Sequence, residues 1–158
     1  MLFRSLAGKV EDMINTVVRQ IAFYSFERAV HTERRNGELT AERIGQIWLS
    51  VQGESLGPAI DIRAGYENFW MYIPHFIHSP FYVYAYAFGD CLVNSLYAVY
   101  ENASDGFAER YLAMLAAGGT KHYSELLKPF GLDAKDPKFW DGGLSVISGM
   151  IDELEAMG

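Results

Sequence analysis

Apolar residues recur at helical spacing along the first long segment of the chain. Between residues 8 and 35 the hydrophobic positions fall three or four residues apart, which is the pattern of an amphipathic helix. Acidic residues at positions 11 and 12 and arginines at positions 34 and 35 place each charge where the helix dipole favours it. The dipeptide Asn36-Gly37 follows directly, and it predicts the end of this helix.

A second apolar stripe predicts a helix in the segment LTAERIGQIWLSVQGESLG, residues 39–57. Thr40 can cap this helix, because its hydroxyl oxygen can accept a hydrogen bond from a backbone N–H of the first turn. The inner face consists of Ile44, Ile47, Trp48 and Val51. Gly57 and Pro58 end the region, and residues 63–73 then predict a short helix or turn before Pro74.

Residues 72–90, with the sequence YIPHFIHSPFYVYAYAFGD, form an aromatic segment with almost no charge. The alternation from Phe81 to Tyr86 is typical of a strand. Against this, Ser79 is a good N-cap, Pro80 suits the first position of a helix, and the apolar residues downstream keep helical spacing. The pattern favours a helix that starts at Pro80 but leaves the strand open, because short aromatic runs are ambiguous.

Three more helices are predicted in the last third of the chain. The segment SDGFAERYLAMLAAGG, residues 104–119, predicts a capped helix ended by two glycines, and TKHYSELLKPFG contains a short helix. The last helix opens with Asp136 as its cap and Pro137 at its first position, and Gly142-Gly143 is an internal weakness. Because the chain has no internal repeat and no low-complexity linker, the pattern predicts an all-α helical bundle, a single domain over residues 1–158.

Composition narrows the classes of function. A length of 158 residues fits one domain with a core, and a net charge of −7 with a pI near 5.0 argues against a nucleic-acid partner. Cys91 is the only cysteine in the sequence, which excludes a disulfide framework and a cysteine zinc cluster and fits a reducing compartment. We therefore expect a cytoplasmic protein.

One stretch, Pro80–Tyr100, is long enough and apolar enough to be considered as a membrane span. Asp90 lies at its centre, and a charge at the middle of a bilayer costs at least about 2.5–3.5 kcal/mol. We therefore expect no membrane segment.

No complete catalytic or metal-binding motif occurs in the sequence. The HExxH, GxSxG, P-loop and GxGxxG patterns are absent. His75 and His78 can lie on one side of a helical turn, but catalytic zinc normally takes three protein ligands, so the alternative is a partly buried histidine bonded to the backbone. Glu27 and His31 are four residues apart in the first helix, and we expect them to form a surface or half-buried pair of small energetic value.

The segment from Tyr66 to Tyr86 carries seven phenol or imidazole groups. Each of them costs about 1–3 kcal/mol when it is buried without a hydrogen-bond partner, so some must face water or a ligand. A tyrosine stripe is usually core with its hydroxyls at the rim, but the wall of a cleft also explains so many polar groups. The residues alone leave both interpretations open.

Four segments resemble one family of enzymes. IPHF followed by SPFYVYAYAFG is similar to the region after the zinc site in oligoendopeptidase F and its relatives, which are zinc metallopeptidases of the thimet oligopeptidase type. Val17–Glu27 resembles the long helix before that region, Tyr111–Trp140 resembles the C-terminal pattern of the family, and Met150–Glu155 resembles its last helix. The resemblance covers nearly the whole chain in the right order.

The resemblance implies an all-helical fold around a deep channel and the hydrolysis of short peptides. In the family, a HExxH helix and a glutamate from a following helix bind the zinc, which polarises the scissile carbonyl and activates water, and the HExxH glutamate acts as general base. The sequence has none of these elements, and MLFRSL resembles the residues just after the third ligand in relatives. The resemblance thus implies a C-terminal part of the catalytic domain that lacks the HExxH segment, binds no metal itself and is inactive alone.

The resemblance also implies roles for six residues of the aromatic segment, through hydrogen bonds to the substrate backbone and to the oxyanion opposite the zinc. They are His75, Tyr84 and Tyr82 as catalytic donors and His78, Tyr86 and Tyr72 as substrate-binding residues. Tyr84 fits the family's tyrosine donor best, and Tyr82 is the alternative. Several relatives carry a tyrosine where this chain has Ile77, and whether His78 replaces that hydroxyl is open.

Three functions remain open. The first is a substrate-facing portion of a zinc metalloendopeptidase that acts on short peptides. The second is a free-standing helical module that binds a peptide or another copy of itself, and the third is a small enzyme that uses His75 or His78 as an acid–base group. In the first case the apolar faces of the first helix and of residues 81–99 lack their partner helices, so we expect the isolated chain to form a two-fold dimer.

Overall fold

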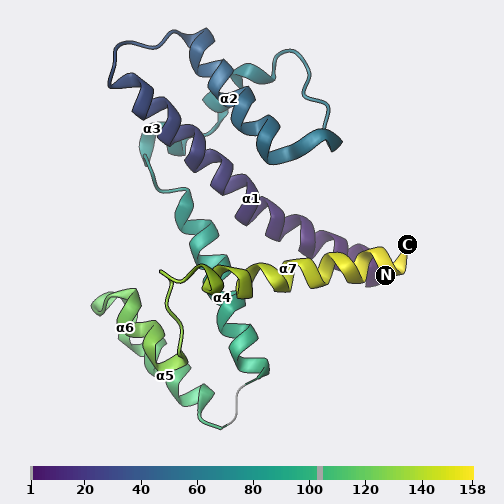
Figure 1. Ribbon diagram of the computed structural model, residues 1–158, viewed down its shortest axis with the longest axis vertical. Helices are drawn as coiled ribbons and strands as arrows, with labels where there is room; N and C mark the ends of the chain where they lie inside the picture. The colour runs from purple at the N-terminus through teal and green to yellow at the C-terminus, as the bar shows by residue number, and fades with distance from the viewer. Residues whose placement is uncertain (1, 103–104) are drawn as a thin grey trace. The chain divides into compact units, whose positions relative to one another are not determined.

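The structure, a computed structural model, describes residues 2–102 and 105–158, and helices make up its regular secondary structure (Figure 1). The α-helices are α1 (Leu2–Arg34), α2 (Ala41–Leu56), α3 (His75–His78), α4 (Tyr84–Glu101), α5 (Phe107–Ala117), α6 (Tyr123–Leu127) and α7 (Pro137–Met157). The 3₁₀ helices are η1 (Gly57–Ala59), η2 (Tyr66–Tyr72), η3 (Gly118–Thr120) and η4 (Lys128–Phe130). No strand occurs in these described ranges, which confirms the predicted all-α fold.

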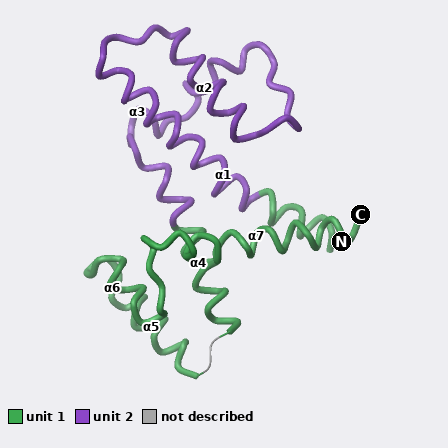
Figure 2. The backbone as a smooth tube through the Cα atoms, viewed as in Figure 1, with its two compact units in different colours: residues 1–11, 89–158 green, residues 12–88 purple. Residues whose placement is uncertain are grey.

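The chain divides into two compact units (Figure 2). Unit 1 contains residues 1–11 and 89–158, and unit 2 contains residues 12–88. The expected single domain over residues 1–158 stays a prediction, because a domain is defined by how the chain folds and unfolds.

Unit 2 is built around an aromatic core that joins α1 to α2. The buried members of this core are Phe23, Phe26, Ile47, Trp48 and Val83. Thr40 caps α2 as predicted, since the backbone N–H of Arg43 donates to its Oγ1 at 3.2 Å. The helical spacing of the apolar residues therefore identifies the inner face of α2 correctly. On α1 it includes Phe23 and Phe26, which are buried, but also Ile14, Val18 and Ile21, which are exposed.

The start of α4 differs from the prediction. The helix begins at Tyr84, four residues after Pro80, and not at Pro80 itself. The backbone N–H of Ser79 donates to the carbonyl oxygen of His75 at 3.0 Å, so Ser79 ends α3 and does not cap α4. Phe81 has a φ of 58°, which lies in the left-handed region and is incompatible with a right-handed helix.

Unit 1 contains a close contact between α4 and α7. Gly143 on α7 lies against the backbone of Cys91, and the hydroxyl of Ser95 donates to the carbonyl oxygen of Phe139 at 2.8 Å. Asp136 caps α7 as predicted, because the backbone N–H of Lys138 donates to its carboxylate at 3.0 Å. The sequence indicated only that Gly143 weakens the helix. The structure adds a packing role, because the missing side chain lets α4 approach α7 closely.

The predicted capped segment of α5 lies partly outside the described residues. Gly106 precedes the helix with a φ of 87° and provides no side-chain cap. Ser104, the first residue of the predicted capped segment, lies outside the described residues.

Within residues 2–102 and 105–158, no helix has both the length and the apolar character that a bilayer crossing requires. Asp90, the residue that argues against a span from Pro80 to Tyr100, lies on α4 and accepts a hydrogen bond from the Asn94 amide at 3.1 Å. Partial burial raises the pKa of the Asp90 carboxyl above its usual value, against the opposing effects of Lys9 and of the Asn94 hydrogen bond.

The raised pKa of Asp90 predicts a pH-dependent loss of stability. Between the ordinary pKa of an aspartate, about 4, and the raised value, the folded protein binds more protons than the unfolded chain. The contribution of this group to the unfolding free energy therefore falls as the pH rises through that window. We expect Asp90→Asn to be more favourable relative to the wild type at neutral pH than in acid, as measured by urea unfolding at both pH values. An equal difference at the two pH values would contradict this expectation.

Candidate active-site wall

The one-turn helix α3 brings His75 to the surface of unit 2. The ring of Phe76 packs inward against Phe23 and Phe26, with ring centroids 5.6 and 5.0 Å apart. This core contact anchors the turn, and His75 on it remains half-buried. The position of His75 therefore depends on the aromatic core directly beneath α3.

His75, Tyr82 and Tyr86 form a cluster of three rings, which we call the His75 cluster. The Nε2 atom of His75 and the hydroxyl of Tyr86 are 3.1 Å apart and form a hydrogen bond whose direction depends on the imidazole tautomer. The Tyr82 ring lies parallel to the imidazole at 6.3 Å and perpendicular to the Tyr86 ring at 5.4 Å. Tyr82 and Tyr86 are 51% and 40% exposed, so a ligand in solution can reach both phenols.

Tyr84 lies outside the His75 cluster. Val83, which lies between Tyr82 and Tyr84 in the sequence, is 0% exposed and belongs to the core of unit 2. The Tyr84 ring contacts Tyr24 of α1 at 6.0 Å and is half exposed. The two candidates for the oxyanion donor, Tyr82 and Tyr84, thus stand in different surroundings on either side of a buried residue.

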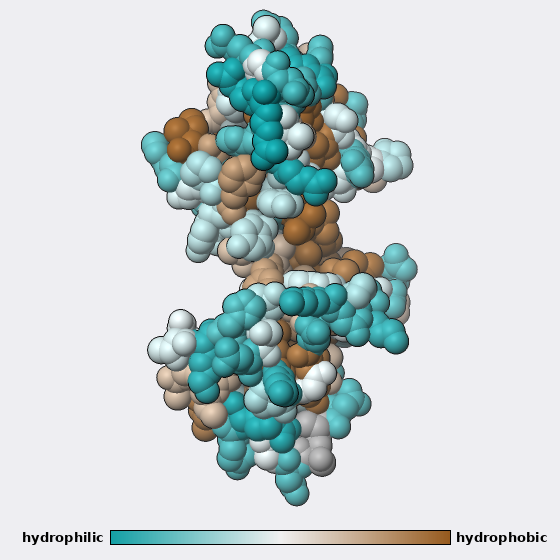
Figure 3. Space-filling model, turned by 60° about the vertical axis from the view of Figure 1, so that its left-hand side comes forward, coloured by the Kyte–Doolittle hydropathy of each residue, from teal (hydrophilic) through white to brown (hydrophobic). Residues whose placement is uncertain are grey.

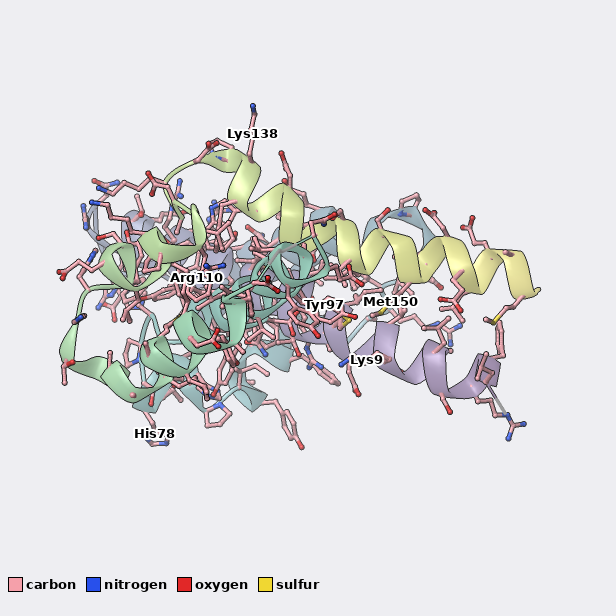
Figure 4. All side chains as sticks on the ribbon, turned by 90° about the horizontal axis from the view of Figure 1, so that it is seen from below. Lys9, His78, Tyr97, Arg110, Lys138 and Met150 are labelled. Carbon is pink, nitrogen blue, oxygen red and sulfur yellow. The ribbon has the colours of Figure 1, made fainter. Side chains whose placement is uncertain are left out.

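His78 and Tyr72 lie at the surface of unit 2. Tyr72, the last residue of η2, is 83% exposed, and Figure 4 shows the His78 side chain pointing outward. Neither side chain has a hydrogen bond or ring contact with another residue in the described part of the chain, although the backbone N–H of His78 donates to the carbonyl oxygen of Pro74 at 2.9 Å. The structure therefore brings three of the six predicted site residues together, namely His75, Tyr82 and Tyr86.

The described residues do not fit a zinc site. Across residues 2–102 and 105–158, no group of three or more histidine, cysteine, aspartate or glutamate side chains could hold a metal ion. The Nε2 atom of His75 is hydrogen-bonded to Tyr86, and His78 points outward. That the chain binds no zinc stays a prediction for metal analysis.

Glu27 is a buried polar residue that the sequence interpretation placed wrongly. It is 2% exposed, and its Oε1 atom accepts a hydrogen bond from the backbone N–H of Phe81 at 2.9 Å. The expected surface or half-buried pair of Glu27 with His31 is wrong, because the carboxylate is in the core and the His31 ring contacts Phe81 at 4.8 Å. Position 27 follows Phe23 by four residues, so the apolar stripe of α1 contained the signal for its burial.

Comparison with known proteins identifies a family. A family profile described as Peptidase family M3 matches residues 1–145. The chain is 30% identical over 151 residues to "Oligopeptidase PepF" of Bacillus subtilis (strain 168), which covers 94% of this chain and 22% of that protein. It is 28% identical over 149 residues to an "Oligoendopeptidase F homolog" of Borreliella burgdorferi, which covers 93% of this chain and 25% of that protein.

Solved structures agree with the sequence matches. The crystal structure of oligoendopeptidase-F from Enterococcus faecium superposes with a TM-score of 0.88 at 28% identity, covering 98% of this chain and 30% of that chain. A putative peptidase from Chlamydophila abortus gives a TM-score of 0.86 at 29% identity, covering 97% of this chain and 26% of that chain. The chain thus spans about a quarter of the length of the curated relatives it matches. The resemblance to oligoendopeptidase F is confirmed.

Proposed function

Because the chain belongs to peptidase family M3, we propose that it supplies the substrate-facing portion of a zinc metalloendopeptidase that hydrolyses short peptides. The observation that carries this proposal is the His75 cluster, where an imidazole and two phenols gather at the surface of unit 2. The 158-residue sequence has no HExxH motif, so another segment has to provide the zinc ligands and the general base. The chain alone is then inactive.

The phenols and the imidazole suit the binding of a peptide backbone. A tyrosine hydroxyl can donate to a substrate carbonyl oxygen, and a donor aimed at a developing oxyanion is commonly worth about 2.7–4 kcal/mol. Zinc, when bound by the intact enzyme, polarises the scissile carbonyl and activates water. Tyr84 is the proposed oxyanion donor and Tyr82 the alternative, while the Tyr86 hydroxyl orients the His75 ring through their hydrogen bond.

Tyr72 and His78, the remaining two predicted site residues, add to the surface that is proposed to bind the substrate. Tyr72 and His78 are exposed and lie at the ends of η2 and α3, the two short helices on either side of Pro74. Side chains without internal partners in the described chain are free to turn toward a bound peptide. We assign them to substrate binding.

Binding without turnover tests the proposed function. Short unstructured peptides, titrated into the chain and followed by NMR, should shift the resonances of His75, Tyr82 and Tyr86, and Tyr82→Phe should weaken binding several-fold, since a hydrogen bond contributes about 0.5–1.5 kcal/mol. Tyr100→Phe, which removes an exposed phenol from unit 1, should leave the affinity unchanged. Turnover of a quenched fluorescent peptide that persists in chelator and follows the protein peak, or shifts confined to unit 1, would overturn the proposal.

Self-association is the second candidate function, and the exposed side of α1 favours it. Ile14, Val18 and Ile21 are 40%, 40% and 46% exposed and share one helix face, and apolar residues reach the surface of the molecule in several places (Figure 3). Soluble monomers rarely expose large contiguous apolar patches. We propose a two-fold homodimer through α1, because identical copies close most simply by that symmetry.

Light scattering after size exclusion tests the dimer. A stable interface buries about 800 Å² per partner, and we expect twice the 17.8 kDa mass of the chain. Ile21→Lys should shift the population toward the monomer because it places a charge in the proposed interface. A mass near 17.8 kDa at high micromolar concentration would contradict the dimer.

We also propose a cytoplasmic location. Cys91 is a free, buried thiol, and a reducing compartment keeps such a thiol in this state.

A further inference from the structure

One face of α1 holds the short segment that joins α3 to α4. The carboxylate of Glu27 accepts from the backbone N–H of Phe81 at 2.9 Å, and the His31 ring contacts the Phe81 ring at 4.8 Å. One turn before Glu27, the Tyr24 ring contacts the Tyr84 ring at 6.0 Å. Tyr24, Glu27 and His31 are spaced by three and four residues, so they lie on one helix face. Three successive turns of α1 therefore contact the segment from Phe81 to Tyr84.

Phe81 adopts a backbone conformation that its own side chain disfavours. Its φ of 58° lies in the left-handed region. Among residues 2–102 and 105–158, Phe81 is the only residue other than glycine that has a positive φ. A bulky residue persists in this region only when its surroundings impose it. The hydrogen bond from its N–H to a carboxylate is of the strong, charge-assisted kind. The Glu27 carboxylate thus holds this turn from α1, together with the backbone hydrogen bond that the Tyr82 N–H donates to the Ser79 carbonyl oxygen at 3.2 Å.

Glu27 is a costly residue for the core of unit 2. It is 2% exposed, and its Oε2 atom is buried with no hydrogen-bond partner among the described residues. A buried carboxylate with an unpaired oxygen loses its hydration without full compensation. A leucine at the same place in the apolar stripe would satisfy packing alone. The presence of a glutamate therefore indicates a task other than packing.

We propose that Glu27 is a positioning residue of the active-site wall: its carboxylate holds the left-handed turn at Phe81, and this turn fixes where Tyr82 and Tyr84 stand. Tyr82 lies between the turn and Val83, which is fully buried in the core, so both of its neighbours are anchored. The inference rests on the proposed function only where it names a peptide as the ligand of the two tyrosines. Glu27 itself does not touch the ligand, because it is buried.

Two substitutions at position 27 separate positioning from packing. Glu27→Gln keeps an oxygen that can accept from the Phe81 N–H, whereas Glu27→Leu keeps the volume and removes the acceptor. We expect the Phe81 amide to be protected from hydrogen exchange in the wild type and in Glu27→Gln. In Glu27→Leu its exchange should accelerate at least about tenfold, the equivalent of about 1.4 kcal/mol. The cross-peaks between the Tyr82 ring and its neighbours His75 and Tyr86 should weaken in the same variant.

Stability and peptide affinity should respond in opposite ways. Replacement of a buried charge by a hydrophobic residue of similar volume is often neutral or stabilising, so the urea midpoint of Glu27→Leu should be unchanged or higher. Its peptide affinity should fall several-fold, and Glu27→Gln should restore it. The same two substitutions at Glu54, an exposed carboxylate on α2, serve as matched controls and should change neither exchange at Phe81 nor affinity.

The outcomes distinguish this inference from the proposed function. If Glu27→Leu leaves the Phe81 amide protected and the Tyr82 contacts intact, the positioning role is overturned. If Glu27→Leu does not fold, an unprotected Phe81 amide in the wild type overturns it, and a protected amide in both the wild type and Glu27→Gln supports it. If the turn loosens as expected but no variant, including the wild type, binds peptides, the positioning role stands and the proposed function fails.

Discussion

Replacement of Trp48 by alanine should lower the unfolding free energy of unit 2 by about 3–5 kcal/mol, the usual cost of a large cavity in a core. Trp48 is 1% exposed. Its ring contacts Phe23, Phe26, Tyr66 and Phe76 at centroid distances of 5.6, 5.1, 5.9 and 6.3 Å. Such a loss is a large part of the stability of a typical domain, about 5–15 kcal/mol.

Urea unfolding followed by circular dichroism measures this loss, and two variants control it. Trp48→Phe should cost much less, because it keeps an aromatic ring and because the indole Nε1 atom is buried without a hydrogen-bond partner to lose. Phe69→Ala removes a ring that is 55% exposed and should change the midpoint little. A loss below about 1 kcal/mol for Trp48→Ala would show that the aromatic core contributes less than its burial indicates.

The same substitution should also disturb the His75 cluster. Phe76 packs on Trp48 and on two phenylalanines of α1, and it lies next to His75 on α3. A cavity at Trp48 removes the support beneath this turn, so the hydrogen bond between His75 and Tyr86 should weaken even where the variant remains folded. The geometry of the His75 cluster therefore depends on the packing of the aromatic core in unit 2.

Elements with local causes were predictable from the sequence. The end of α1, the Thr40 cap of α2 and the Asp136 cap of α7 each depend on residues within a few positions of one another, and each occurs where the pattern predicts it. Helical spacing also identifies the face of α2 that carries Ile47 and Trp48. Local propensity and tertiary packing agree at these positions.

The segment around Phe81 was not predictable in the same way. Ser79 and Pro80 have the local chemistry of a helix start, but the Glu27 carboxylate, 54 positions earlier, binds the Phe81 N–H and holds a turn there. A contact at that separation overrides the local preference and moves the start of α4 to Tyr84. The grouping of the site follows from this turn, because it decides which tyrosine meets His75.

The resemblance to a family selected the residues of the site, while the structure arranges them. Spacing alone relates His75 to His78, three residues away, yet the structure pairs His75 with Tyr86, eleven residues away. That pairing requires α3, the turn and the first turn of α4 together. The course of the backbone therefore places neighbouring tyrosines in different surroundings. Tyr82 and Tyr86 lie in the His75 cluster, whereas Tyr84 contacts Tyr24.

Gly143→Ala should destabilise unit 1, although alanine is the better helix former. A Cβ atom at this position would lie 2.7 Å from the carbonyl oxygen and 3.2 Å from the Cα atom of Cys91, both of them backbone atoms of α4. Because neither can move without the helix, α4 and α7 have to separate. Overpacking of this kind costs about 1–3 kcal/mol and occasionally more. Gly143→Val should cost more than alanine, since its branched side chain adds contacts in the same space.

Gly149 in the same helix provides the opposite expectation and the control. It is exposed, and a Cβ atom there would meet nothing within 4 Å. Gly149→Ala should therefore raise the unfolding free energy by about 0.5–1 kcal/mol, the difference between glycine and alanine inside a helix. Denaturant unfolding of the two alanine variants thus tests a difference in sign within one helix. If both variants stabilise the protein, α7 does not pack against Cys91 as closely as the distances show. The effect of alanine at position 143 is then set by helix propensity alone, and Gly143 has no packing role.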